Sequence, residues 1–202
     1  GEVRPVARIE QRFAEAEKDM AQAMKVADRK DDVHYQYANL IYQHRLLQAK
    51  TPYEPWTLER ALQESKEAYA ASPMSVYLQQ QAQLLFAMDK FEDAFQLYQQ
   101  LTKSEMRSAD IFYAAAQCRM ALNDQDGAIA QLDSAVNTFS KPYLRAAAPY
   151  LMARARLLDK AGKYRPAVND FNEYEKLMPG QLTADFYYLR EQTEVAGHLF
   201  QQ

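Results

Sequence analysis

The chain lacks the features that mark disulfide-stabilised and membrane-spanning proteins. It has one cysteine in 202 residues, which excludes an intrachain disulfide and any metal site built from several cysteines. No apolar run approaches the roughly 18 residues that a transmembrane helix needs. Glycine occurs five times and proline eight times, so little of the chain suits long loops or the tight turns of a strand-rich fold.

An excess of charge of one sign is also missing. Lys and Arg number 24, Asp and Glu number 27, and the formal net charge is −3. Because the two signs are interspersed, we expect no nucleic-acid partner and no anionic membrane surface. The single cysteine fits a reducing compartment without excluding a bacterial envelope, so the compartment stays open between periplasm or cell envelope and cytoplasm. The 48% hydrophobic content, rich in Ala and Leu beside Gln and Glu, predicts a folded helical protein.

Catalytic signatures are absent as well. No zinc-protease, nucleophile-elbow or phosphate-loop motif occurs. His34, His44 and His198 have no metal-ligand spacing, because His34 and His44 are ten residues apart, about 1000° around a helix, and point to different sides. Cys118 falls on a buried side of its helix, which favours an inert core thiol. We therefore predict no enzyme, no cofactor and no metal site.

What the chain does have is a repeated pattern. In each copy an alanine is followed four residues later by a large apolar residue. The three pairs are Ala94 and Tyr98, Ala128 and Leu132, and Ala167 and Phe171. Successive alanines are 34 and 39 residues apart, and a period in the thirties is typical of a helical repeat array. Alanine at a helix crossing lets two helices approach to the lower end of the usual 8–10 Å separation.

Short polar turns separate two helical stripes in each copy. These turns are Asp89-Lys90, Asn123-Asp124 and Ala161-Gly162-Lys163. The acid pairs Asp31-Asp32 and Glu92-Asp93 fall at expected helix starts, where the helix dipole favours negative charge. We predict a single array over residues 1–202. Its parts are an N-terminal helix (1–30), a repeat with a Pro/Trp insert (31–73), three repeats (74–107, 108–141 and 142–180) and a terminal helix of a partial repeat (181–202).

These units resemble the tetratricopeptide repeat. That repeat has a small residue in its first helix, an aromatic residue and an alanine opening its second, and a proline at its close. Phe91 with Ala94, and Tyr164 with Ala167 and Pro179, carry the resemblance. It implies an all-α fold, a right-handed superhelical α-solenoid of antiparallel helix pairs, with about four repeats plus partial terminal helices. Several bacterial proteins of this kind work in the cell envelope.

The resemblance also implies a binding surface. In this family the faces of the first helices that do not pack form a concave groove, which holds extended peptides. Transferred to this chain, that groove consists of Tyr35, Asn39, Tyr42, Gln79, Gln83, Phe86, Tyr113, Gln117, Met120, Met152 and Arg156. Its amides can pair with a peptide backbone, and its tyrosines and methionines offer adaptable apolar contact.

One activity of the family is not expected here. Chaperone-binding members hold a C-terminal carboxylate with Lys, Asn and Arg on successive first helices. Asn39 matches one of these places, but Tyr35, Asp110 and Ala114 stand at the others. An aspartate would repel a carboxylate, so we predict that this clamp is missing.

Three local features carry expectations of their own, and two of them allow more than one interpretation. Tyr53 and Trp56, in the insert that begins at Ala49, form either an aromatic plug over the first repeat or a loop that grips a ligand. Phe186 with Tyr187-Tyr188 is expected to cover the last hydrophobic face. The stripe of Phe13, Ala16, Met20 and Ala23 predicts a second helix of a repeat, whose first helix is missing or reduced to Val3–Glu10.

The sequence favours a protein–protein interaction scaffold that binds an unidentified protein or extended peptide in its groove. A structural spacer or assembly subunit that contacts partners through its ends is the alternative, and an enzyme or small-molecule binder with a pocket near Trp56 is a third. The pattern specifies neither the partner nor the oligomeric state.

Overall fold

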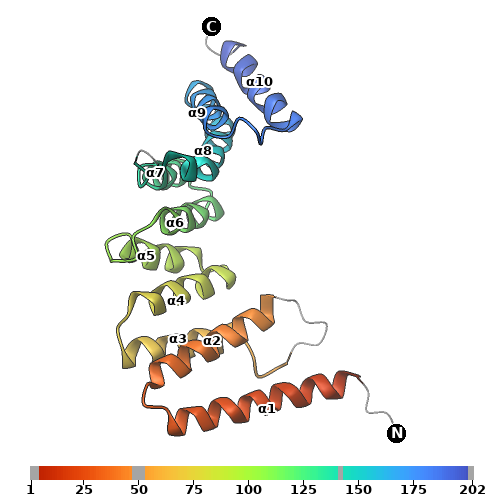
Figure 1. Ribbon diagram of the computed structural model, residues 1–202, viewed down its shortest axis with the longest axis vertical. Coiled ribbons are helices and arrows are strands. Elements are labelled where there is room, and N and C mark those ends of the chain that lie inside the picture. The colour runs from red at the N-terminus through yellow and green to blue at the C-terminus, as the bar shows by residue number, and fades with distance from the viewer. Residues whose placement is uncertain (1–4, 47–52, 141–142, 200–202) are drawn as a thin grey trace. The chain divides into compact units, whose positions relative to one another are not determined.

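The computed structural model describes residues 5–46, 53–140 and 143–199. All regular structure in these segments is helical, which confirms the predicted all-α class (Figure 1). The chain forms two compact units, Gly1–Leu97 and Tyr98–Gln202. Their boundary falls inside α5 (Phe91–Leu101). The division into individual repeats and the superhelical curvature stay predictions.

The first unit contains α1 (Pro5–Val26), α2 (Lys30–Leu46), α3 (Leu58–Ala71), α4 (Ser75–Ala87) and the start of α5. Helices α2 and α3 pack against each other most extensively, and α4 packs on α3. Tyr37, Ala38 and Ile41 are buried as the helical period predicts. Ala61, Ser65 and Ala68 of α3 are fully buried as well, so the α2–α3 pair encloses a continuous core.

The second unit contains the end of α5, then α6 (Ala109–Ala121), α7 (Gln125–Val136), a 3₁₀ turn η1 (Tyr143–Ala147), α8 (Ala148–Lys160), α9 (Tyr164–Leu177) and α10 (Ala184–Leu199). The pairs α6–α7 and α8–α9 are the tightest, and α7 packs on α8. One hydrophobic cluster joins Leu132, Leu158 and Phe171 with Phe186 of α10. Because one helix pair cannot enclose such a core alone, neighbouring pairs share it.

The three repeat alanines lie where the pattern places them. Ala94, Ala128 and Ala167 have no exposed surface. Their large partners four residues later are buried as well, at most 4% exposed. A larger side chain at any of these fully buried alanines would have to displace closely packed neighbours.

Equivalent turns close the pairs α4–α5, α6–α7 and α8–α9. Asp89, Asn123 and Gly162 have positive φ angles of 57°, 59° and 71°. In each turn the next residue donates its N–H to the carbonyl five residues back, as Lys90 does to Leu85 at 2.9 Å. The left-handed residue itself donates to the carbonyl three residues back, as Asp89 does to Phe86 at 3.1 Å. This pair of hydrogen bonds defines the Schellman motif, and Gly, Asn and Asp are the residues that tolerate its left-handed position.

The N-terminal helix contradicts one of its two predicted alternatives, the one with a first helix reduced to Val3–Glu10. Residues from Pro5 to Val26 form one continuous helix, so the part of Val3–Glu10 that is described does not form a separate first helix. No glycine or proline follows Pro5 before Val26, so nothing in the sequence interrupts the helix. The predicted stripe of Phe13, Ala16 and Met20 is half-buried.

The aromatic plug is confirmed for Trp56, whereas residues 47–52 of the insert lie outside the described segments. Trp56 is 1% exposed. Its ring packs against Phe13 and His44 at centroid separations of 5.0 and 5.2 Å. Its indole N–H donates to Glu17 Oε1 at 2.6 Å. Trp56 therefore joins the segment after α2 to α1 and presents no face to a ligand.

The expectation for the end of the chain is only partly right. Phe186 is 6% exposed and lies edge-on to Phe171 at 5.9 Å. Tyr187 and Tyr188, however, are 45% and 66% exposed, so their predicted covering role is wrong. Consecutive helical residues are about 100° apart, and all three cannot face one core. None of the helices in the described segments is both long and apolar enough to cross a membrane.

Candidate functional site

In the first unit the predicted binding residues occupy one face of α2 and one face of α4. Gln80 of α4, a residue that sequence reasoning did not select, ties these faces together. Its amide nitrogen donates to the backbone oxygen of Tyr35 at 3.0 Å and to Asn39 Oδ1 at 2.8 Å. The Tyr35 ring lies 5.4 Å from that of Tyr77. Tyr35 and Asn39 therefore take part in the contact between α2 and α4.

The remaining residues of that set differ in accessibility. Tyr42 and Gln79 are half-buried, and burial raises the pKa of Tyr42 above its ordinary value. The ring of Phe86 is half-buried and lies edge-on to Phe91, with centroids 5.2 Å apart. Gln83 is exposed. Of the six predicted positions in this unit, Gln83 offers a side-chain amide most openly to a partner.

In the second unit, Tyr113 of α6 belongs to an aromatic group that reaches α8. Its ring lies 5.8 Å from that of Tyr150, which stacks on Phe139 at 5.7 Å. The Tyr150 hydroxyl donates to Asp110 Oδ1 at 2.5 Å. Burial, followed by this bond, raises the pKa of Tyr150 to about 12. Asp110 is exposed at the start of α6, so the acidic position that argues against a carboxylate clamp is open to solvent.

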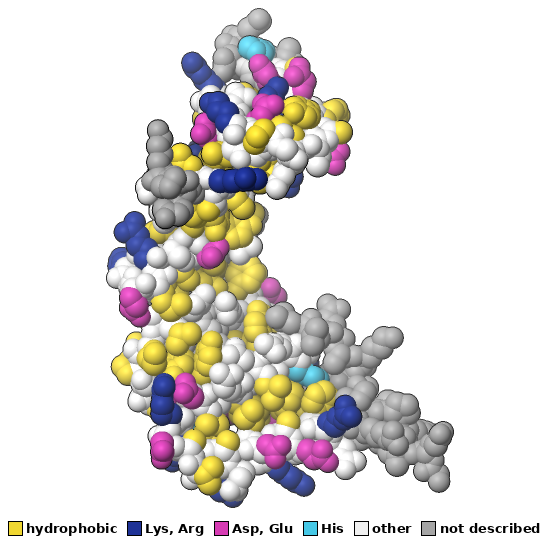
Figure 2. All heavy atoms as spheres, in the orientation of Figure 1, with side chains coloured by type: hydrophobic (Ala, Val, Ile, Leu, Met, Phe, Trp, Pro, Cys, Tyr) yellow, Lys and Arg dark blue, Asp and Glu magenta, His cyan; other side chains and the backbone are white. Residues whose placement is uncertain are grey.

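Three further predicted residues of the second unit are exposed. They are Gln117, Met120 (46% exposed) and Arg156. Gln83, Gln117 and Arg156 follow one another at the repeat spacing of 34 and 39 residues, so each holds the same place on its own helix. On the face shown in Figure 2, basic and acidic side chains are scattered over both units rather than gathered in one patch.

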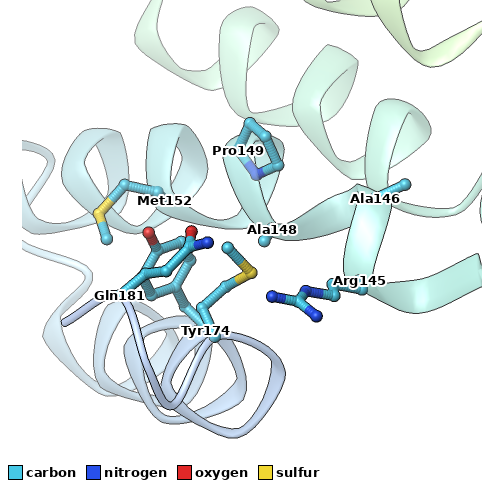
Figure 3. Close-up of a pocket in the computed structure, with 8 residues that line it drawn as sticks. Arg145, Ala146, Ala148, Pro149, Met152, Tyr174 and Gln181 are labelled. Carbon is cyan, nitrogen blue, oxygen red and sulfur yellow. The ribbon is translucent and has the colours of Figure 1, made fainter.

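The last predicted residue, Met152, lines a cleft of about 700 Å³. Two alanines and six larger residues form its walls. The larger residues are Arg145 of η1, Pro149 and Met152 of α8, Tyr174 of α9, and Met178 and Gln181 after α9. Figure 3 shows Arg145 extending into the cleft from one side, toward Tyr174, and Met152 on the other side near Gln181.

Sequence reasoning selected only Met152 of this cleft. A signal for Tyr174 is present in the repeat itself. Leu101 and Ala135, seven residues after their repeat alanines, are fully buried, but Tyr174 at the equivalent place is half-buried. A large aromatic residue at a place otherwise filled by a buried aliphatic one indicates a local opening. Arg145 carries no comparable signal, because among the described residues the 3₁₀ turn before α8 has no counterpart before another helix.

The other chemically versatile side chains serve packing. Cys118 is fully buried, as expected for a core thiol. His34 Nδ1 lies 2.7 Å from Glu64 Oε2, which joins α2 to α3. His44 is 8% exposed, and burial lowers its pKa. The described residues contain no cluster of three or more His, Cys, Asp or Glu side chains that could hold a metal ion.

The acid pairs lie in the first turns of α2 and α5, as predicted. Asp31 does more than favour a helix start. It accepts a hydrogen bond from Tyr77 Oη of α4 at 2.8 Å and lies 3.0 Å from Arg29 Nη2. These two bonds lower the pKa of Asp31 to about 2. The carboxylate therefore ties the start of α2 to the neighbouring helix pair.

Comparison with solved structures identifies the fold. The protein is similar to YrrB, a tetratricopeptide-repeat protein, with 17% identity and a TM-score of 0.63 over 87% of this chain and 82% of that one. It is similar to MamA from Desulfovibrio magneticus RS-1, with 13% identity and a TM-score of 0.65 over 88% and 96%. It is also similar to PilF of Pseudomonas aeruginosa, with 16% identity and a TM-score of 0.62 over 96% and 86%. No protein-family model and no curated protein matches the sequence. The fold is thus that of tetratricopeptide-repeat proteins.

Proposed function

We propose that this protein is a non-catalytic interaction scaffold that binds a protein or extended peptide along the first helices of its repeats. One observation carries the proposal. Gln83, Gln117 and Arg156 hold the same place on α4, α6 and α8, and all three are exposed. The residues four positions earlier, Gln79, Tyr113 and Met152, are half-buried. On each of these helices an exposed hydrogen-bonding group thus lies one turn from a half-buried contact residue, which suits contact with an extended backbone.

The comparison with YrrB supports this proposal. That protein is described as a TPR protein with an unusual peptide-binding site. Fold similarity alone does not establish a shared function, so the proposal depends mainly on the exposed positions that recur on α4, α6 and α8. The remaining members of the predicted groove, including Tyr35, Asn39, Tyr42, Phe86 and Met120, are proposed to line the same surface.

A peptide selection with paired variants tests the scaffold. Peptides are selected from a random library on the wild-type protein, and their affinities are then measured for two double variants. Gln83→Ala with Gln117→Ala removes two groove amides. Gln63→Ala with Gln99→Ala removes two exposed amides from the second helices α3 and α5. We expect a loss of about tenfold or more for the first pair, equivalent to about 1.4 kcal/mol, and none for the second. Equal affinities for the two double variants, or no selected peptide, would contradict the proposal.

A second candidate is assembly through α10, which is favoured by an exposed face of this helix. Tyr188 and Val195 lie seven residues apart on one helix face and are 66% and 48% exposed. Tyr188→Asp with Val195→Asp should abolish any concentration-dependent association seen by light scattering. Met74→Asp, at a site 44% exposed in the first unit, is the matched control. If the wild-type protein stays monomeric at high concentration, self-assembly through this face is excluded.

A further inference from the structure

The cleft between η1, α8 and the end of α9 is lined mainly by apolar residues. Its larger apolar walls are Pro149, Met152, Tyr174 and Met178. A volume of about 700 Å³ lies within the range of sites that bind drug-sized ligands, so the cleft has room for an apolar side chain together with its adjoining backbone. Two methionines give such a surface adaptability, because the thioether side chain is flexible and polarisable. The walls therefore suit a large apolar side chain such as leucine or phenylalanine.

The local course of the chain explains why this space is open. Helix α9 ends at Leu177 and the next helix begins at Ala184. Between them, Met178 and Gln181 lie beside the start of α8 instead of a further packed helix. On the other side, η1 ends where α8 begins and brings Arg145 to the rim. The cleft is thus bounded by two irregular segments and floored by α8.

The described lining of the cleft carries charge of one sign only, which is positive. Arg145 is its one charged lining residue among those described, and no Asp or Glu lines it. Arg145 is exposed, and within the described part of the chain its guanidinium forms no ion pair. By contrast, Arg154 and Arg190 of the same unit are paired with carboxylates at 2.6 to 2.8 Å. A guanidinium beside an apolar cleft is complementary to a carboxylate next to an apolar side chain.

We propose that this cleft binds an apolar side chain of an extended partner peptide, and that Arg145 pairs with an Asp or Glu next to that side chain. The proposal rests on the scaffold function above and deepens it, because Met152 belongs to both surfaces. The cleft is largely open to solvent, whereas small-molecule sites bury most of their ligand. Anionic membranes are recognised by clusters of four or more basic residues, and this cleft has one.

Fluorescence anisotropy with short labelled peptides tests the pairing. The probe is amidated Ser-Gly-Leu-Asp-Gly-Ser. A Leu-Asn version, with Asn in place of Asp, removes the charge. A Ser-Asp version, with Ser in place of Leu, removes the apolar side chain. We expect the Leu-Asp peptide to bind about five- to tenfold more tightly than either. Arg145→Gln should remove the preference for Asp over Asn. Arg145→Glu should reverse it in favour of a Leu-Lys peptide. Arg165→Gln, which changes an exposed arginine of α9 outside the cleft, should leave it unchanged.

Methyl NMR locates the bound peptide. The Leu-Asp peptide should shift the methyl signals of Met152 and Met178 and leave that of Met74 in place. Absence of binding up to about 1 mM, an unchanged order of affinities in Arg145→Glu, or shifts confined to other methionines would overturn the proposal. Tighter binding of a peptide that ends in Leu with a free carboxylate would overturn the assignment to an internal acidic residue.

Failure of this inference is distinguishable from failure of the scaffold function. If library-selected peptides depend on Gln83 and Gln117 but not on Arg145, the scaffold stands and the cleft assignment is wrong. If the Leu-Asp peptide depends on Arg145 while the double variant of Gln83 and Gln117 binds every peptide normally, the cleft acts alone and the wider groove is wrong.

Discussion

Arg154 of α8 joins three helices, and its removal should destabilise the second unit strongly. Its Nε and Nη2 atoms donate to the two carboxylate oxygens of Asp170 in α9, each at 2.7 Å. Its Nη1 atom donates to Asp133 of α7 at 2.8 Å. The hydrogen bonds with Asp170 raise the pKa of Arg154, which therefore stays charged. The two carboxylates differ in environment, because Asp170 is nearly buried and Asp133 is half exposed.

The magnitude follows from the environments of the two carboxylates. Removing one partner of a buried ion pair costs about 3–5 kcal/mol, since the other charge stays buried and unpaired. The Arg154 side chain retains 18% exposure, so water screens part of the penalty, and we expect about 2–3 kcal/mol for Arg154→Met. Asp133→Ala removes a partner that is 51% exposed and should cost less than about 1 kcal/mol. The double variant Arg154→Met with Asp170→Leu leaves no buried charge and should recover most of the loss.

Urea unfolding followed by circular dichroism measures these differences. Hydrogen exchange in α8 and α9 shows whether the loss is local, because repeat arrays need not unfold in a single step. The reasoning is refuted if Arg154→Met and Asp133→Ala are equally destabilised, or if the double variant is less stable than Arg154→Met alone.

Three other predictions concern packing, turns and pH. Ala128→Leu should destabilise the protein by about 1–3 kcal/mol through overpacking. Ala130→Leu, at an exposed site on the same helix, should change the urea midpoint little, and equal effects would contradict the packing role. Asp89 is held at positive φ, a conformation that costs Gly less than Asp, so Asp89→Gly should stabilise the protein by about 0.5–1 kcal/mol. Asp93→Gly in the first turn of α5 should destabilise the protein by about 0.5–1 kcal/mol, because Gly has the lower helix propensity and the favourable interaction of Asp93 with the helix N-terminus is lost. The same sign of change for both variants in thermal melting would argue against strain at Asp89. Because the folded pKa of Asp31 is about 2, below its ordinary value of 3.8, its contribution is present above pH 4 and lost as pH falls toward 2. Asp31→Asn should flatten the pH dependence of the urea midpoint in that window, and parallel curves would refute the role of this carboxylate.

The sequence predicted the helix pairs because their determinants are local. A small residue and a large one four positions later define a packing stripe of period 3.6, and Ala94, Ala128 and Ala167 are buried accordingly. Ties between helices were not predictable in this way. Tyr77 reaches Asp31 across 46 residues, and Arg154 reaches Asp133 across 21. Periodicity contains no information about which polar residues of separate helices meet.

The candidate surface was predictable to a smaller extent. The repeat spacing places Gln83, Gln117 and Arg156 at equivalent positions, and all are exposed. It does not show that Asn39 bonds to Gln80, since that contact depends on how α4 packs against α2. It also misses Arg145, because the 3₁₀ turn that positions this residue breaks the period.

The turns and the alanines together define what the three well-formed copies share. The left-handed residues Asp89, Asn123 and Gly162 each precede a buried alanine by five residues. Since the Schellman motif fixes the direction in which the chain leaves the first helix, the alanine five residues after the left-handed residue is fully buried in all three copies. The aromatic residue that opens the second helix in the family is replaced by Gln125, yet α7 still begins there and Ala128 is still buried. The three copies therefore share a left-handed turn residue followed five positions later by a buried alanine, whereas the aromatic position is not common to all of them.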